Sequence, residues 1–331
     1  MTFETYARYA WYLEQIKVPQ GTVLGPLLFL VFINDLPEVV KHSSVKLFAD
    51  DCFLFKHIKS SDDAMKLQQD LTSLEESDQQ WQMKFHPEKC TVMRIGTNSR
   101  MKRDTNYSLH GHILEVESSS KYLGVNISDD LTWKDHIEKT ASKANRTVGF
   151  LRRNMLDCSK RVQNAAYVSL VRPVVEYACA AWDPHTTEDI NRLDQVQRRS
   201  ARFVCNNYRD RTPGCVTQMT KDLNWEQLPD RRQKHRLSML YKIQNKIVDV
   251  DASDILRPND RRTRGQQRLY QPRATSNVYK FSFYPRTIHI HEWNLLPSGV
   301  TESPTIEAFQ TALSNHYSAV FQRQYTENRC I

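Results

Sequence analysis

Residues 45–55 read VKLFADDCFLF, two short apolar and aromatic runs on either side of Asp50 and Asp51. Such runs are typical of β-strands, so we predict a β-hairpin that carries two carboxylates at its tip. Asp-Asp is a poor choice for a tight hairpin turn, in which Asn-Gly or Asp-Gly is favoured. Two adjacent negative charges repel each other, and a divalent cation such as Mg²⁺ would relieve that repulsion. The alternative interpretation is an ordinary solvated turn.

Two other Asp-Asp pairs in the chain have simple structural explanations. The pair at 62–63 opens an expected helix, where negative charge complements the helix dipole. The pair at 129–130 follows a serine in a polar turn. Only the pair at 50–51 lies between apolar runs, which makes it the candidate metal site.

The segments around this hairpin predict a mixed first part. Residues 1–17 are mixed and aromatic, and at most a short helix is expected there. Residues 23–33 are apolar almost all round, which is typical of a buried helix, with Thr22 as a possible cap. Helical spacing of apolar residues begins after Ser61 and continues to Trp81. Further strands are expected at 90–95, 113–116 and 121–127.

After residue 130 the pattern becomes helical. Apolar residues at steps of three and four predict a long helix over 137–155 and a third helix over 190–204. Between them, 161–181 predicts a helix that is kinked at Pro173. Another helix begins near 228, and a final one is expected near 304–318. The predicted fold class is therefore α+β, an antiparallel sheet with helices followed by a helical second part.

The charge of the chain is divided unequally. Residues 1–130 hold 14 Lys and Arg against 18 Asp and Glu, whereas the remainder holds 32 against 20. A strongly basic second part indicates a polyanionic partner, with nucleic acid ahead of a membrane surface. Charge that serves solubility alone is the alternative. The candidate nucleic-acid-binding side chains on the predicted helices are Lys143, Arg146, Arg152, Arg153, Arg198, Arg199 and Arg202.

The seven cysteines and the hydropathy narrow the class of protein. The count of cysteines is odd and no CxxC motif occurs, so we expect reduced thiols in an intracellular protein of the cytoplasm or nucleus. The longest apolar run, residues 23–33, is too short to span a bilayer, so no membrane partner is expected.

Four sequence blocks, in one order, resemble the reverse transcriptases of non-LTR retrotransposons, particularly jockey-like elements. Residues 48–51, FADD, look like the (Y/F)xDD hairpin of that family. Residues 18–37, VPQGTVLGPLLFLVFINDLP, resemble its PQG block. Residues 85–93, FHPEKCTVM, are similar to the lysine-bearing segment after the palm helix. Residues 121–125, KYLGV, look like the primer-grip hairpin that leads into the thumb.

The resemblance implies RNA-directed DNA polymerisation, in which Mg²⁺ assists attack of a DNA primer 3′-hydroxyl on a dNTP opposite an RNA template. It assigns metal binding to Asp50 and Asp51, and places Phe48 and Ala49 beside them at the substrate. Lys89 would act in catalysis by protonating the pyrophosphate or orienting the triphosphate, although a solvated surface lysine is equally compatible with its position. The nucleotide and template pocket would include Pro19, Gln20 and Gly21. The primer end would meet Tyr122, Leu123 and Gly124, for which a plain strand core is the alternative.

In domain terms, we expect an unassigned segment at 1–17, a partial palm at 18–130 and a thumb-like helical region at 131–215. A basic C-terminal region follows at 216–331, with an exposed linker at about 249–280. In the family the fingers and the first catalytic aspartate precede the PQG block, whereas residues 1–17 contain no Asp.

We therefore expect a C-terminal fragment that binds Mg²⁺ weakly and has little polymerase activity alone. A non-enzymatic nucleic-acid-binding remnant of a mobile element is the second hypothesis, and a decayed product without function is the third.

Overall fold

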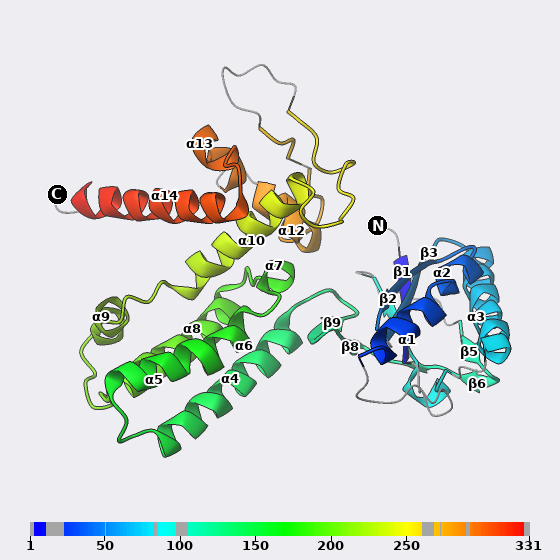
Figure 1. Ribbon diagram of the computed structural model, residues 1–331, viewed down its shortest axis with the longest axis horizontal. Coiled ribbons are helices and arrows are strands. Elements are labelled where there is room, and N and C mark those ends of the chain that lie inside the picture. Colours follow the sequence, from blue (N-terminus) through cyan, green and yellow to red (C-terminus); the bar gives the residue numbers. More distant parts are fainter. Residues whose placement is uncertain are drawn as a thin grey trace. The chain divides into compact units, whose positions relative to one another are not determined.

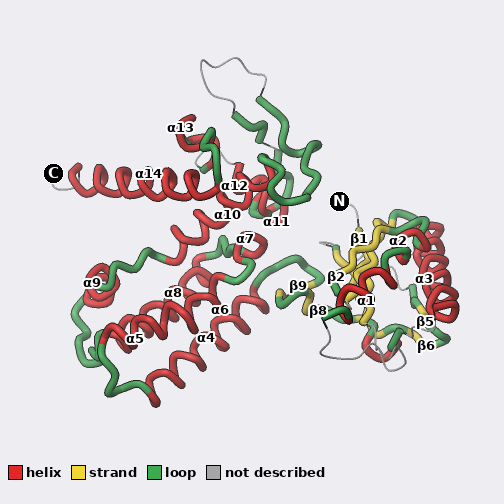
Figure 2. The backbone as a smooth tube through the Cα atoms, in the orientation of Figure 1, coloured by secondary structure: helices red, strands yellow, loops and turns green. Residues whose placement is uncertain are grey.

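The computed structural model describes residues 3–10, 23–49, 51–81, 85–96, 105–259, 268–271, 273–288 and 292–327. The chain divides into two compact units, Met1–Trp133 and Lys134–Ile331. The first unit combines a sheet with helices, and the second is built from helices and loops (Figure 2). The mixed α+β class that the sequence predicts is therefore confirmed at this level.

A five-stranded sheet forms the centre of the first unit, in the order β2-β3-β1-β4-β7, with β1 (Phe3–Ala10) in the middle. The predicted hairpin is present, because β2 (Ser44–Phe48) and β3 (Asp51–Ile58) pair antiparallel. On the far side of β1 lies β4 (Thr91–Ile95), which follows the 3₁₀ turn η1 (Pro87–Lys89). The edge strand beside β4 is β7 (Glu115–Val116), which pairs parallel with it.

The long helix α3 (Ser61–Trp81) confirms the helix expected after Ser61 and supplies the core of this unit (Figure 1). Its apolar side chains recur at helical spacing, so they form one stripe that faces the sheet. Alternate side chains of β3 and β4 meet that stripe, because successive residues of a strand point to opposite faces. The buried residues of this core include Ala64, Leu67, Leu71, Leu74, Cys52, Leu54 and Val92.

The strand β1 (Phe3–Ala10) lies in the middle of the sheet, between β3 and β4, and pairs antiparallel with both. The short helix considered for residues 1–17 is therefore wrong for this segment. The register joins Ala10 to Asp51 and Arg8 to Thr91. A strand with partners on both sides takes its conformation from them, and the mixed sequence of residues 3–10 contains no alternation that would have indicated this.

The apolar helix α1 (Gly25–Ile33) exists, but the expectation that it is buried is wrong. Its N-cap residue is Leu24, which makes no side-chain cap hydrogen bond, and the possible cap Thr22 lies outside the described residues. Ile33 is buried in the core, and α2 (Leu36–Val39) follows directly. Most of the other apolar side chains of α1 face solvent, because the neighbouring elements contact only one side of the helix.

Two short hairpins complete the first unit. The strands β5 (Ser108–Leu109) and β6 (His112–Ile113) form one, which α3 holds through hydrogen bonds between Gln68 and both backbone polar groups of Ser108. The strands β8 (Ser119–Tyr122) and β9 (Val125–Ser128) form the other. The strand expected over 121–127 is therefore interrupted by a turn at Leu123 and Gly124.

The second unit begins with a group of packed helices. The long predicted helices are confirmed as α4 (Lys134–Asn154), α8 (Thr187–Val204) and α10 (Leu228–Gln244). The helix expected over 161–181 is divided into α5 (Lys160–Ala166), the π-helical turn η3 (Tyr167–Val171), α6 (Arg172–Glu176) and α7 (Cys179–Trp182). Pro173 cannot donate a backbone hydrogen bond, which accounts for the irregular turn before it.

The remaining helices are α9 (Cys215–Asp222), α11 (Asn277–Lys280), α12 (Phe283–Ile288), η4 (Trp293–Leu295), α13 (Ser298–Thr301) and α14 (Ile306–Glu327). A second apolar cluster joins α10 to α12, η4 and α14 through Leu237, Tyr241, Ile288, Trp293 and Phe309. No helix within the described ranges is long and apolar enough to cross a membrane.

Candidate functional site

The tip of the β2–β3 hairpin is a two-residue connection. Phe48 pairs with Asp51, so Ala49 and Asp50 form the link, and Asp50 lies outside the described residues. Ala49 has a φ of 49°, in the left-handed region that L-residues with a Cβ rarely adopt. Asp51 is the first residue of β3 and is half-buried. The tip of this hairpin is therefore tight, and its backbone is strained at Ala49.

Asp51 belongs to the face of the sheet that α3 leaves uncovered. Cys52 and Leu54 are buried towards α3, so Asp51 and Phe53 point to the opposite face. Directly opposed residues of an antiparallel pair share a face, and Phe48 is opposed to Asp51. The Phe48 side chain is 60% exposed. A carboxylate and aromatic rings therefore gather on one partly open face.

The β8–β9 hairpin lies against this face. The ring of Tyr122 stacks on the ring of Phe53, with 4.9 Å between the centroids and an angle of 29° between the planes. Phe53 is two residues after Asp51, so this contact holds the β8–β9 hairpin beside the β2–β3 hairpin. The backbone hydrogen bond from the Gly96 N–H to the Asp129 oxygen also attaches this hairpin region to the end of β4.

The tip of the β8–β9 hairpin carries two residues with positive φ, Leu123 at 44° and Gly124 at 83°. Two such residues are what a type I′ hairpin turn requires, and Asn-Gly is its preferred sequence. The apolar side chain of leucine, unlike that of Asn or Asp, has no polar atom that could stabilise this backbone conformation. Backbone strain at a turn lowers stability, and such strain concentrates at functional sites.

The other predicted site residues are placed as follows. Lys89 ends η1, immediately before β4, and it is exposed. Pro19, Gln20 and Gly21 lie outside the described residues. The structure therefore brings Phe48, Ala49, Asp51 and Tyr122 into one region.

A carboxylate such as Asp51 is the hard oxygen ligand that Mg²⁺ prefers. Among the residues that the structure describes, no three His, Cys, Asp or Glu side chains lie together so that they could hold a metal ion. The described side chains near Asp51 therefore do not fit a complete metal centre, and we derive no chemical step through a metal here.

The helices α4 and α8 lie side by side and run in the same direction. At their beginnings Arg192 contacts Glu138 at 3.4 Å, and at their ends the guanidinium of Arg152 lies 4.4 Å from the ring centroid of Tyr208, just beyond α8. The predicted basic residues on these two helices are thus on neighbouring elements of one unit.

Most of these basic side chains are exposed. Lys143, Arg146 and Arg153 recur at steps of three and seven along α4, which places them on one face of that helix. Arg198 and Arg199 are exposed on α8. In the described part of the chain, none of these five forms an ion pair with a carboxylate. Arg198 still interacts electrostatically with Asp194, and the charge of the other four is available to an external anion.

Arg202 has a different environment. Its guanidinium is half-buried and donates to the backbone oxygens of Asn207 at 3.1 Å and Asp210 at 2.9 Å. It fixes the loop that follows α8. That loop presents two exposed arginines, Arg209 and Arg211, which the sequence reasoning missed. Their spacing in YRDRTPG was the available signal.

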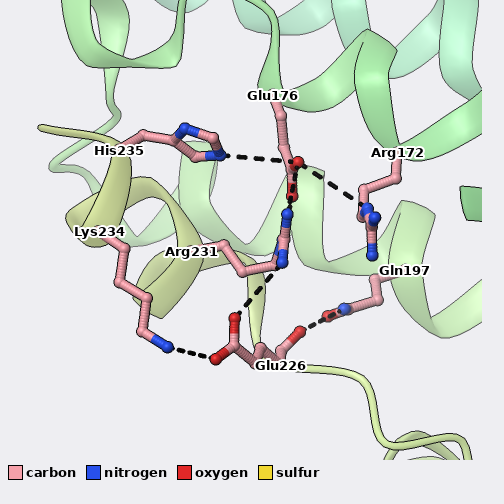
Figure 3. A network of polar contacts seen from close by, with 7 residues as sticks. All are labelled: Arg172, Glu176, Gln197, Glu226, Arg231, Lys234 and His235. Carbon is pink, nitrogen blue, oxygen red and sulfur yellow. Dashed lines mark hydrogen bonds and ion pairs between the residues drawn. The ribbon is translucent and has the colours of Figure 1, made fainter. Parts of the chain in front are cut away.

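A polar network joins α6 to α10 (Figure 3). Glu176 accepts hydrogen bonds from Arg231 and lies 3.8 Å from His235 and 3.9 Å from Arg172. Burial of the Glu176 carboxyl alone would raise its pKa, but the hydrogen bonds from Arg231 and His235 outweigh burial and lower the pKa to about 2. The same figure shows Glu226 held by Arg231, Lys234 and Gln197.

A second, more deeply buried cluster centres on Asp183. Its carboxylate forms ion pairs with Arg232, Arg236 and Arg286, and Arg236 also contacts Glu292. Burial and the two neighbouring arginines lower the pKa of Arg286 to about 10. Both networks connect helices within the unit, and we assign them a structural role.

Part of the chain is similar to a known protein family. Residues 3–127 match the family model described as reverse transcriptase (RNA-dependent DNA polymerase). The match begins at residue 3, so it includes β1, upstream of residue 18 where the sequence resemblance was expected to begin.

Three relatives come from Drosophila melanogaster. The probable RNA-directed DNA polymerase from transposon BS is 28% identical over 231 residues, which cover 66% of this chain and 25% of that protein. The RNA-directed DNA polymerase from mobile element jockey is 26% identical, covering 56% of this chain and 21% of that protein. The probable polymerase from transposon X-element is 25% identical with the same coverage. The chain thus spans about a quarter or less of the length of these relatives. Residues 3–127 thus match the reverse transcriptase family, and the chain is similar to RNA-directed DNA polymerases of Drosophila transposons and mobile elements.

Proposed function

We propose that this chain supplies part of the palm and the thumb of an RNA-directed DNA polymerase, and that its own activity is binding of a template–primer duplex. The observation that carries the proposal is the stacking of Tyr122 on Phe53, which holds the β8–β9 hairpin beside the acidic hairpin. A primer end held by the β8–β9 hairpin would then lie next to the carboxylates at the tip of the β2–β3 hairpin. Residues 18–130 correspond to the palm, 131–215 to the thumb and 216–331 to the basic C-terminal region.

In this proposal Asp50 and Asp51 contribute oxygen ligands to Mg²⁺, the divalent metal expected for the family. Phe48 and Ala49, with Pro19, Gln20 and Gly21, line the nucleotide and template pocket, and Lys89 contacts the triphosphate. Tyr122, Leu123 and Gly124 hold the primer end. The tight turns at Ala49 and Leu123 support these roles, since strained backbone of this kind concentrates at functional sites.

We expect little or no nucleotide transfer by the isolated chain. Nucleotidyl transfer from a dNTP to a primer 3′-hydroxyl, with release of pyrophosphate, needs metal ions held in place by several ligands, and the described side chains near Asp51 do not provide three. Primer extension on an RNA template with Mg²⁺ or Mn²⁺ measures this directly. Robust extension that is lost in Asp51→Asn but retained in Asp62→Asn would contradict the expectation, because Asp62 belongs to a structural acidic pair that begins α3.

Duplex binding is assigned to the exposed basic side chains of α4 and α8. Each Lys or Arg that contacts a phosphate releases counterions, so affinity should fall steeply with salt. The experiment is a salt titration of binding to an RNA–DNA duplex, with wild-type protein and with a Lys143→Gln, Arg146→Gln, Arg153→Gln variant.

We expect the triple variant to lose affinity and to lower the salt slope by about one per contact removed. Arg192→Gln is the matched control, because Arg192 lies on α8 but is already paired with Glu138 and Glu188. A flat salt response, or an equal loss in the control, would contradict the assignment.

The second candidate is a nucleic-acid-binding protein without enzymatic activity, derived from a mobile element. The exposed arginines of the loop after α8, Arg209 and Arg211, favour it, because they enlarge the basic surface of α4 and α8, which lies wholly outside residues 3–127 that match the family model. Binding that needs Arg209 and Arg211 but is indifferent to Asp51→Asn and Tyr122→Ala would favour this candidate over a polymerase subsite.

A further inference from the structure

The helix α1 carries an apolar surface that faces solvent. Leu24, Leu27, Leu28 and Val31 are 61, 57, 55 and 70% exposed, and each lies three or four residues from two of the others, which places them on one helix face. Val23 and Leu30, at 94 and 53%, extend the same surface. We call these six residues the α1 stripe. Soluble monomers rarely expose a contiguous apolar surface of this kind without a partner.

We propose that the α1 stripe is the contact surface of a homodimer, in which it packs against the α1 stripe of a second copy. A two-fold axis brings identical residues together, so a self-interface must contain no group that repels its own copy. Residues 23–34 contain no charged side chain, which meets that requirement in a chain with a net charge of +8.

The exposed area of the α1 stripe agrees with a second copy of the chain as its partner. The six side chains expose roughly 700 Å² together, close to the ~800 Å² that each partner contributes to a standard interface. The three- and four-residue spacing also forms the ridges by which two helices interdigitate.

The ends of the helix favour an antiparallel pair. A two-fold axis across the stripe would place the first turn of one α1 near the last turn of the other, so the helix dipoles oppose each other favourably. Asp35 and the exposed Glu38 follow the C-terminal end, and their negative charges would then approach the N-terminus of the partner helix. The same acidic residues disfavour an anionic membrane as the occupant, since helices that lie on such membranes carry Lys and Arg beside the apolar face.

Sedimentation equilibrium of the full chain over about a hundred-fold range of concentration tests the proposal. We expect a reversible change from 38.8 kDa to twice that mass. The Leu27→Glu, Leu28→Glu variant should stay monomeric throughout, because the interface would then bring four carboxylates together. Its circular dichroism and melting should match wild type at low concentration, since both leucines are exposed in the monomer.

The matched control is Leu295→Glu, which places the same charge on an apolar side chain that is 56% exposed in the second unit, and it should leave the dimer intact. A wild-type chain that remains monomeric, a dimer that persists in the double variant, or a dimer that Leu295→Glu abolishes would each overturn the proposal. Binding of the monomer to anionic vesicles in place of self-association would overturn it in favour of a lipid surface. The result does not depend on polymerase activity or duplex binding.

Discussion

The helices α1 and α10 reverse the usual relation between hydropathy and burial. The first contains no charge and exposes most of its leucines, whereas the second places Arg232 and Arg236 at 1 and 2% exposure. The reason lies in their neighbours. Asp183, Glu292 and the apolar cluster of the C-terminal region surround α10, while only one side of α1 meets the core of the first unit. Burial therefore follows the available partners, even where composition indicates the opposite.

The largest effect should come from removing the charge at the centre of the α10 cluster. Asp183→Asn keeps the shape of the side chain but leaves Arg232 and Arg236 buried without their carboxylate. Breaking a buried ion pair in this way costs about 3–5 kcal/mol of unfolding free energy. Urea unfolding measures it. The exposed pair between Asp254 and Arg257 supplies the control, and Asp254→Asn should cost less than about 1 kcal/mol. Equal effects would show that the buried cluster is dispensable.

Two leucines, one on the buried α10 and one on the exposed α1, should respond very differently to truncation. Leu237→Ala on α10 removes a fully buried side chain and should cost about 2–5 kcal/mol, because a cavity is left in the second apolar cluster. Leu28→Ala on α1 should change the stability of the monomer by no more than about 0.5 kcal/mol. Thermal or urea unfolding at a concentration that keeps the chain monomeric decides this. A large loss for Leu28→Ala would mean that α1 is covered in solution by its own chain.

A smaller, pH-dependent effect is expected from the network between α6 and α10. Because Glu176 has a folded-state pKa of about 2, below the ordinary value of 4.5, its contribution is complete above about pH 4.5 and is lost as the pH falls towards 2. We expect Glu176→Gln to destabilise the chain by about 2 kcal/mol at neutral pH and by much less near pH 2.

Denaturant unfolding across this pH range measures the difference between the two proteins. Glu138→Gln is the control, since Glu138 makes an exposed contact with Arg192 and should show no such pH dependence. A Glu176→Gln deficit that is constant with pH would indicate a packing role for this residue in place of an electrostatic one.

Local patterns were sufficient for several elements of the fold. The β2–β3 hairpin and the helices α3, α4 and α8 follow from alternation, from three- and four-residue spacing and from turn residues, since neighbours along the chain decide these features. The pair at 50–51 was separated from the other acidic pairs by the same local reasoning. Four sequence blocks also indicated the family, and the comparisons confirm it.

Other features of the site could not be predicted, because they depend on residues far apart in the chain. The stacking of Tyr122 on Phe53 joins positions that are 69 residues apart, and neither residue alone indicates the other. Arg202 looked like its neighbours Arg198 and Arg199, but the loop after α8 engages its guanidinium. The position of a side chain on a helix predicts its face, whereas its hydrogen-bond partners depend on what packs beside that face.

The sequence by itself determined the long helices, the acidic hairpin, the basic second part and the family resemblance. Tertiary structure alone decided that residues 3–10 pair between β3 and β4, that the apolar α1 stripe faces solvent and that the arginines of α10 are buried around Asp183. Secondary structure follows from interactions over a few residues. Strand partners, burial and charge pairing are set by contacts between distant segments, which no local pattern encodes.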